Sequence, residues 1–173
     1  IKIIESSIKI ASNEIRDRAE LVKEIEPDLP CVSGSASRVG QVLLNLLINA
    51  AQAIEPGAAG RNRICLRAQR RGSRVVIEVS DTGAGIAREL QERIFEPFFT
   101  TKPVGVGTGL GLSVCHSVVS QMGGELTVES EPGKGSLFRV ALPLAGGVLE
   151  AAAVLADLQS GTAGRPQATG TGN

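Results

Sequence analysis

The sequence predicts a single α+β domain in which amphipathic helices accompany paired β-strands. Residues 1–16 and 110–122 carry apolar side chains at helical spacing, and residues 38–54 are apolar on most sides. Two apolar runs, 63–70 and 74–80, are separated by a short turn that contains Gly72, as in a β-hairpin. With 173 residues and 42% hydrophobic content, the chain is long enough to bury one core without disulfides or metals.

The first half of the chain is predicted to form a helix, a strand, a loop and a second helix. One face of the first helix, which should end near residues 16–18, carries Ile1, Ile4, Ile8, Ala11 and Ile15. Residues 19–26 alternate well enough for a strand, and the Pro, Gly and Ser content of residues 27–37 indicates a loop. Residues 38–54 should then form a helix that is largely buried in the core.

The second half is predicted to contain a long loop between two helices, followed by two strands. Residues 87–94 are expected to form a short helix that Pro97 stops, and the loop at 95–109 has the length of a lid or binding segment. The helix at 110–122 has apolar positions at Leu110, Val114, Val118 and Met122, and strands should follow at 125–130 and 136–143. We therefore expect a domain over residues 1–144 and a disordered tail over residues 145–173.

The balance of charges argues against nucleic acid as a partner. The 18 basic residues equal the 18 acidic residues, so no field of one sign attracts a polyanion. Aromatic residues make up only 2% of the chain, which leaves few stacking platforms for single-stranded bases. The same balance gives no reason to expect contact between this domain and an anionic membrane.

The cysteines indicate a reducing compartment. Cys31, Cys65 and Cys115 are widely spaced and share no metal-binding pattern with the lone histidine, so we expect them to be reduced core residues of a cytoplasmic domain. No apolar run reaches the roughly 18 residues of a membrane helix. Since the chain begins at Ile1 and not at Met, we expect a piece of a longer protein, and membrane anchoring of that protein stays open.

Two asparagines in the buried helix are candidates for binding a cation. Asn45 and Asn49 lie four residues apart and so share one helix face, with Gln41 one turn earlier. A buried amide without partners costs about 1–3 kcal/mol, and amide oxygens suit a hard cation such as Mg²⁺ that substrate phosphates complete. The alternative, that both amides bond neighbouring backbone, is equally compatible with the sequence.

Two glycine-rich stretches could hold a nucleotide. Asp81 ends a strand and opens a turn in which Gly83 and Gly85 would let a flat ligand approach, and an ionised carboxylate accepts hydrogen bonds from an amine such as that of adenine. The stretch GVGTGLGL leads into a helix whose first N–H groups could bind phosphate, which Lys102 could also reach. Taken singly, the first stretch is more typical of an ordinary turn, and the second lacks the ending of a P-loop.

The order and spacing of these features resemble the ATP-binding catalytic domain of the sensor histidine kinases, in the superfamily shared with DNA gyrase and MutL. The matching motifs are an N box NLLINAAQAI, a G1 box DTGAGI, an F box FEPFFTTK and a G2 box GTGLGL. The closing stretch GGELTVESEPGKGSLFRVALPL is similar to the last two strands of that family, and the resemblance covers residues 1–144. It implies a two-layer α/β sandwich of the Bergerat type, with a mixed, mostly antiparallel sheet, helices on one face, and ATP between the layers.

The resemblance also implies roles for individual residues. Asp81 would bind the adenine amine, with Ser136 sharing a water, and Asn49 with Asn45 would hold Mg²⁺. The implied catalytic residues are Asn45, Asn49 and Lys102. The implied nucleotide-binding residues are Asp81, Gly83, Gly85, Ile86, Thr101, Gly107, Thr108, Gly109, Leu110, Gly111, Leu112 and Ser136. Phe95, Phe98 and Phe99 would anchor the lid against the core and the partner, unless they serve only as core packing.

The family's reaction needs an acceptor that this chain lacks. In relatives the phosphorylated histidine lies ahead of this domain, whereas His116 follows the G2 box and is interpreted as structural. We therefore expect a catalytic domain that is monomeric by itself and that passes the γ-phosphoryl group of ATP to a separate dimerisation and acceptor domain, which then serves a response regulator.

Other functions within the superfamily stay open. A nucleotide-gated binding module, an anti-sigma-type serine kinase and a gyrase-like ATPase are the alternatives. One departure from the family concerns phosphate binding, because Gln52 stands where many relatives carry a basic residue.

Overall fold

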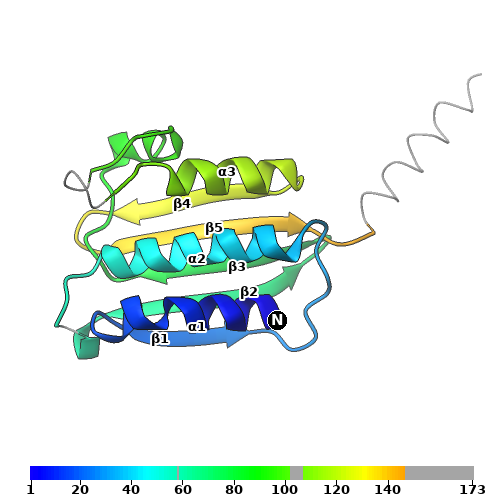
Figure 1. Ribbon diagram of the computed structural model, residues 1–173, viewed down its shortest axis with the longest axis horizontal. Helices are drawn as coiled ribbons and strands as arrows, with labels where there is room; N and C mark the ends of the chain where they lie inside the picture. The colour runs from blue at the N-terminus through cyan, green and yellow to red at the C-terminus, as the bar shows by residue number, and fades with distance from the viewer. Residues whose placement is uncertain (58, 102–106, 147–173) are drawn as a thin grey trace, which may run out of the picture.

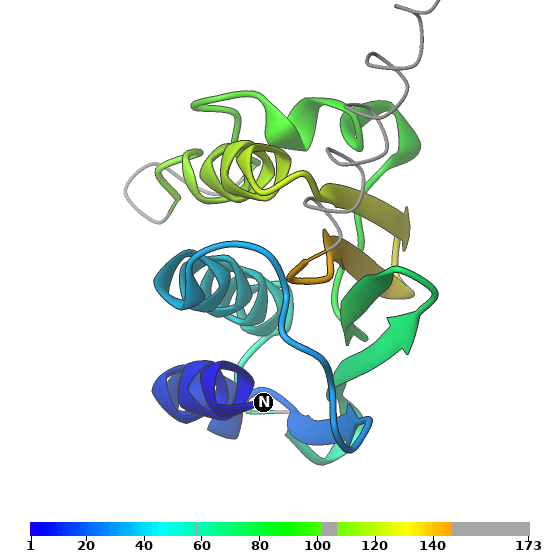
Figure 2. The same ribbon diagram turned by 90° about the vertical axis from the view of Figure 1, so that its right-hand side faces the viewer.

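The computed structural model describes residues 1–57, 59–101 and 107–146, and these form two layers. One layer is a five-stranded sheet with the order β1-β2-β3-β5-β4, and helices cover one face of it, as Figures 1 and 2 show. Strand β1 (Glu20–Ile25) runs parallel to β2 (Arg63–Arg71), whereas β3 (Arg74–Asp81), β5 (Gly135–Pro143) and β4 (Glu125–Glu131) continue the sheet with antiparallel pairings. The expected mixed, mostly antiparallel sandwich is confirmed.

Helix α2 (Ala36–Gln52) is the centre of the helical layer, between α1 (Lys2–Arg16) and α3 (Gly111–Gln121) in Figure 1. Its side chains Leu43, Leu46 and Leu47 are fully buried. Burial of one such side chain contributes roughly 1.5–3 kcal/mol, so this helix supplies a large part of the hydrophobic stabilisation. Since α2 also ends beside the last residue of β3, its packing sets the position of the residues described below as a candidate site.

The other face of the sheet carries a row of charges. Glu78, in the middle strand β3, is only 6% exposed, because two arginines from neighbouring strands lie over it. Arg139 Nε donates to Glu78 Oε1 at 2.8 Å, and Arg67 Nη1 lies 3.7 Å from Glu78 Oε2. Arg67 and Arg139 also pair with Glu24 and Glu129 respectively, so opposite charges alternate across the strands. This pairing lets one strand have an apolar face toward the helices and a charged face away from them.

The prediction of a short helix at residues 87–94 is wrong. The segment forms two 3₁₀ turns, η2 (Arg88–Leu90) and η3 (Arg93–Phe95), and a third, η1 (Ala59–Arg61), precedes β2. Eight residues are too few to make helix nucleation favourable without tertiary help. Here the tertiary contacts favour the turns, because the Gln91 side chain donates to the carbonyls of Ile86 and Ser130.

The apolar positions that marked α3 in the sequence are only partly its buried face. Cys115 and Val119 face the core, whereas Leu110 and Val114 are each 37% exposed. Apolar residues occur on more than one side of this helix, so periodicity alone could not select the buried side. Met122, at the end of the helix, is buried as expected.

The cysteines differ in burial, in contrast to the prediction from the sequence. All three cysteines are free. Cys115 is buried, Cys65 is half-buried and Cys31 is exposed, so the prediction that all three are core residues is wrong for Cys31. The hairpin turn at Gly72, the strands and the two longer helices lie where they were predicted. The expected tail at 145–173 falls outside the described residues from residue 147 onward.

Replacement of Gly135 tests how closely β5 packs on the end of β3. A Cβ at Gly135, whose φ is +101°, would overlap the carbonyl oxygen of Asp81, whereas Gly133, with a φ of +77°, has open space around it. We expect Gly135→Ala to lower the free energy of unfolding by ~3 kcal/mol or more, and Gly133→Ala by about 1 kcal/mol. Urea denaturation followed by circular dichroism measures both. Equal losses would contradict the close packing at Gly135.

Candidate functional site

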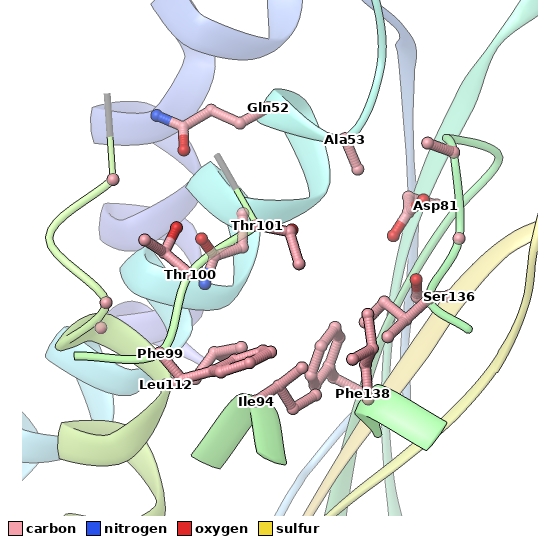
Figure 3. A pocket seen from close by; sticks show the side chains of 18 of the residues that line it. Gln52, Ala53, Asp81, Ile94, Phe99, Thr100, Thr101, Leu112, Ser136 and Phe138 are labelled. Atoms are coloured by element: carbon pink, nitrogen blue, oxygen red, sulfur yellow. The ribbon is translucent and has the colours of Figure 1, made fainter. Parts of the chain in front are cut away.

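A cavity of about 620 Å³ opens where α2 ends, β3 ends and α3 begins. Its size lies within the range of about 300–1,000 Å³ that is usual for small-molecule sites. Figure 3 shows side chains that converge on it from the sheet, from α2 and from the segment around residue 100. The cavity therefore joins elements that lie far apart in the sequence.

Most of the site residues predicted from the sequence line this cavity. They are Asn49, Asp81, Gly85, Ile86, Thr101, Gly107, Thr108, Gly109, Gly111, Leu112 and Ser136. Asn45, Gly83 and Leu110 are not among the lining residues. Lys102 falls outside the described residues. The structure thus brings together residues of all four sequence motifs and of the last strand.

Asp81 lies at the sheet side of the cavity and is only 7% exposed. Its carboxylate accepts hydrogen bonds from the backbone N–H groups of Gly83, at 2.8 Å, and Ser136. Burial raises the pKa of the Asp81 carboxyl above its ordinary value, and these two hydrogen bonds oppose that rise. The backbone therefore holds an acceptor in a fixed orientation at the cavity wall.

Gly83 serves the packing of the turn, a role that the sequence did not predict. A Cβ here would overlap the carbonyl of Ala53, just after the last turn of α2. The next residue, Ala84, donates its N–H to that same carbonyl at 2.9 Å. The glycine thus lets the turn after β3 bond directly to the end of α2, which fixes Asp81 relative to Asn49.

The two asparagines of α2 have different surroundings. Asn49 lines the cavity, whereas the amide of Asn45 faces α3, with its Nδ2 3.5 Å from both the Gly111 carbonyl and the Cys115 sulfur. Asn45 therefore lies between two helices, as in the alternative interpretation of the sequence. Within the described ranges, no group of three or more His, Cys, Asp or Glu side chains could hold a metal ion.

One side of the cavity is apolar. Figure 3 shows Ile94, Phe99, Leu112 and Phe138 together below Asp81 and Thr101. Phe99 belongs to the predicted lid loop, whereas Ile94 belongs to the segment predicted as a short helix, and neither Ile94 nor Phe138 was predicted as a site residue. The signal was available, because Phe138 lies two residues after Ser136 in β5 and so points to the same face of the strand. An apolar wall beside a buried acceptor suits a flat aromatic base that carries an amine.

The phenylalanines of the F box have three different environments. Phe95 packs on His116 with 5.3 Å between ring centroids, and Phe99 lines the cavity under the guanidinium of Arg93, 4.5 Å from its centroid. Phe98 is 76% exposed and has a φ of +67°. Packing in the core therefore accounts in part for the presence of a phenylalanine at positions 95 and 99, but it does not account for the exposed Phe98.

The opposite end of the cavity is formed by the start of α3. Gly111 and Leu112 of the first turn line the cavity, as do Thr108 and Gly109 before it. The N-cap residue Leu110 makes no side-chain capping hydrogen bond. The first N–H groups of a helix have no partner within the helix, so this end can bind an anion.

Comparison with known families agrees with this geometry. Residues 34–146 match the family described as "Histidine kinase-, DNA gyrase B-, and HSP90-like ATPase". The chain belongs to this family. The cavity thus lies in an ATPase domain, and ATP is the nucleotide that such a domain binds.

Individual relatives of this ATPase domain are sensor kinases. The chain is 52% identical to the two-component sensor PprA of Pseudomonas aeruginosa over 66% of its length, and 42% identical to the sensor histidine kinase ZraS of Escherichia coli over 82%. The solved catalytic domain of the histidine kinase ThkA is similar with a TM-score of 0.71 and 29% identity, over 83% of this chain and 91% of that one. ThkA has also been solved in complex with the response regulator protein TrrA.

The matched region is a small part of these relatives. It spans 13% of the length of PprA and 30% of the length of ZraS. In the described part of this ATPase domain, no helix combines the length and the hydrophobicity needed to cross a membrane.

The buried carboxyl of Asp81 gives a prediction about stability and pH. Because its pKa is raised, the folded chain binds this proton more tightly than the unfolded chain. The stability that this bound proton gives to the fold is fully present when the pH is below the ordinary Asp pKa. It is lost as the pH rises through the raised pKa of Asp81. Asp81→Asn does not titrate, so its stability relative to the wild type should increase from acid to neutral pH.

Urea denaturation of both chains between about pH 4 and pH 7 measures this difference, across the window above the ordinary Asp pKa of about 3.9. Asp28→Asn is the matched control, since Asp28 is exposed. A difference between wild type and Asp81→Asn that stays constant with pH would contradict the effect of burial.

Proposed function

We propose that this chain is the catalytic domain of a two-component sensor histidine kinase, which transfers the γ-phosphoryl group of ATP to a histidine on a separate dimerisation and acceptor domain. The observation that carries the proposal is one cavity with a buried acceptor, Asp81, at one end and the start of α3 at the other. The sensor kinases among the relatives support the histidine kinase reaction over the binding-module and serine kinase alternatives.

Asp81 and the apolar wall would bind the adenine. The carboxylate would accept from the exocyclic amine, while Phe138 and Ile86 contact the flat base. Ser136 would contribute a second polar contact beside Asp81. The burial of Asp81 supports this role, because exclusion of water strengthens the interaction of a fixed acceptor with a donor.

The other end of the cavity would hold the phosphates. Gly107, Gly109 and Gly111, which line the cavity, would present backbone N–H groups. From the sequence alone, we also propose that Lys102, which lies outside the described residues, adds a positive charge. The donor set also fits Mg²⁺, since the Asn49 amide and the hydroxyls of Thr101 and Thr108 are hard oxygen donors that line one cavity. When bound, the metal would neutralise the charge that develops on the transferred group.

The residues of the chain would mainly position the substrate. Phosphoryl transfer requires the donor to be held in line with the acceptor, and most of the rate enhancement comes from orientation and charge stabilisation. Asn49 would help to hold the metal beside the phosphates, and the helix start would fix the far end of the triphosphate. The acceptor histidine would enter from outside the cavity, where residues of the lid region meet the partner domain.

The partners follow from this reaction. The acceptor domain would belong to the same kinase, and its phosphoryl group would pass to a response regulator, in keeping with the complex known for ThkA. We expect the isolated chain to be monomeric, because dimerisation in the sensor histidine kinases belongs to the separate acceptor domain. We also expect a cytoplasmic domain, whether or not the whole protein is anchored in a membrane.

The role of Asn49 is tested against Asn45 as the matched control. Calorimetric titration with a non-hydrolysable ATP analogue should show binding that Mg²⁺ strengthens. Asn49→Ala should lose that strengthening, about tenfold or more in affinity, whereas Asn45→Ala, which faces α3, should keep it. Asp81→Asn should lose binding with and without the metal. If Asn45→Ala abolished the metal effect and Asn49→Ala did not, the assignment of the metal to Asn49 would be wrong.

Transfer is tested with the acceptor domain of the same kinase and labelled ATP. Phosphate should appear on the acceptor histidine with the wild-type chain and not with Asn49→Ala. A folded chain that binds ATP but transfers nothing to its own acceptor domain would favour the nucleotide-gated binding module.

Gln52 provides a prediction about phosphate affinity. It lines the cavity at the position where many histidine kinases carry a basic residue. Gln52→Lys should tighten binding of the ATP analogue by roughly 3–10-fold at low salt, because it adds one charge near the triphosphate. The gain should shrink as salt is raised and should be absent for adenosine. An equal gain for adenosine would show that Gln52 does not lie beside the phosphates.

A further inference from the structure

Ser130, in β4, lies behind the cavity, and its hydroxyl makes three hydrogen bonds that join parts of the cavity wall. Its hydroxyl oxygen accepts from the backbone N–H of Ile86 at 2.8 Å and donates to the carbonyl of Gly135 at 2.8 Å. The same oxygen lies 3.0 Å from the hydroxyl oxygen of Ser136. Ser130 therefore connects the turn after Asp81, the start of β5 and one cavity residue.

A count of protons sets the direction of the bond between the two serines. A serine hydroxyl has one proton to donate and two lone pairs to accept with. A carbonyl only accepts, so the proton of Ser130 goes to Gly135, and one lone pair takes the N–H of Ile86. The remaining lone pair accepts the proton of Ser136. The Ser136 hydroxyl has then used its proton and presents only lone pairs to the cavity.

The cavity wall near Asp81 is consequently made of acceptors. The ionised carboxylate of Asp81 can only accept hydrogen bonds. Ser136, its partner across β3 and β5, can also only accept them from a ligand, because its own proton goes to Ser130. Both side chains are 7% exposed, and Figure 3 shows them at the same wall. An exocyclic amine has two N–H donors to match two acceptors, whereas a carbonyl at the same place of the base would meet two acceptors and lose both bonds.

We propose that Ser130 is a positioning residue that makes the nucleotide site selective for a 6-amino purine over a 6-oxo purine, by holding the Ser136 hydroxyl as an acceptor. This inference rests on the proposed function, since it takes the cavity to be a nucleotide site. Ser130 is not among the residues that line the cavity, so it acts through Ser136 and not by contact with the base.

Gln91 offers a control that separates selectivity from general support of the loop. Its amide donates to the backbone carbonyls of Ile86, at 3.1 Å, and Ser130, at 2.8 Å. It thus ties the same loop to the same strand without touching either serine hydroxyl. Removal of the Gln91 side chain should loosen the loop and weaken the binding of all nucleotides to the same extent.

The experiment compares ADP with inosine diphosphate, which carries an oxygen in place of the amine at position 6 of the purine. Calorimetric titration gives the ratio of the two dissociation constants for the wild type, Ser130→Ala, Ser130→Thr and Gln91→Ala. The wild type should prefer ADP. Ser130→Ala should reduce this preference by about 5–10-fold, because Ser136 can then turn and donate, while Ser130→Thr should keep it. Gln91→Ala should weaken the binding of both ligands and leave the ratio of their dissociation constants unchanged.

A double-mutant cycle with Ser136→Ala tests the path of the effect. If Ser130 acts through Ser136, the double variant should be no less selective than Ser136→Ala alone. Should Ser130→Ala fail to fold, Ser130→Cys, with a weak acceptor of similar size, takes its place. A ratio in Ser130→Ala or Ser130→Cys equal to that of the wild type would overturn the role of Ser130 only. A folded wild-type chain that binds no ADP would instead overturn the proposed nucleotide function.

Discussion

The fixed position of the Asp81 carboxylate at the end of a buried strand is the constraint on which the site depends. A carboxylate that is 7% exposed loses most of its hydration, and two backbone N–H groups replace part of it. One of them comes from the turn after β3 and the other from the neighbouring strand β5. Any shift of either element would leave the charge without its donors, so the sheet, the turn and the carboxylate form one rigid unit.

The helical layer is attached to this unit at the end of α2. The Ala53 carbonyl, just past the helix, accepts from the N–H of Ala84 in the same turn, and Gly83 has no side chain to prevent this approach. The position of Asn49, one turn before the end of α2, is therefore coupled to that of Asp81. The fully buried leucines of α2 hold the helix in place against the sheet, so core packing sets the distance between Asn49 and Asp81.

The side of the sheet away from the helices has a different role. The paired charges around Glu78 compensate a buried carboxylate. Glu78 and Asp81 lie in the same strand, three residues apart, and so point to opposite faces. One is surrounded by arginine side chains, whereas the other is held by backbone N–H groups and faces a cavity. The strand thus separates an acid used for structure from an acid available to a substrate.

The sequence by itself determined the elements and most of the site. Helical and alternating periods depend on local spacing, so α1, α2 and the strands could be located, and the four motifs named most of the residues that line the cavity. Only the tertiary structure decided that Asn45 faces α3, that Gly83 packs against Ala53, that residues 88–95 form 3₁₀ turns, and which side of α3 is buried. Ser130 and Phe138 also emerged from the fold. The physical reason is that these features depend on contacts between residues far apart in the chain, and no local pattern encodes which neighbour a side chain will meet.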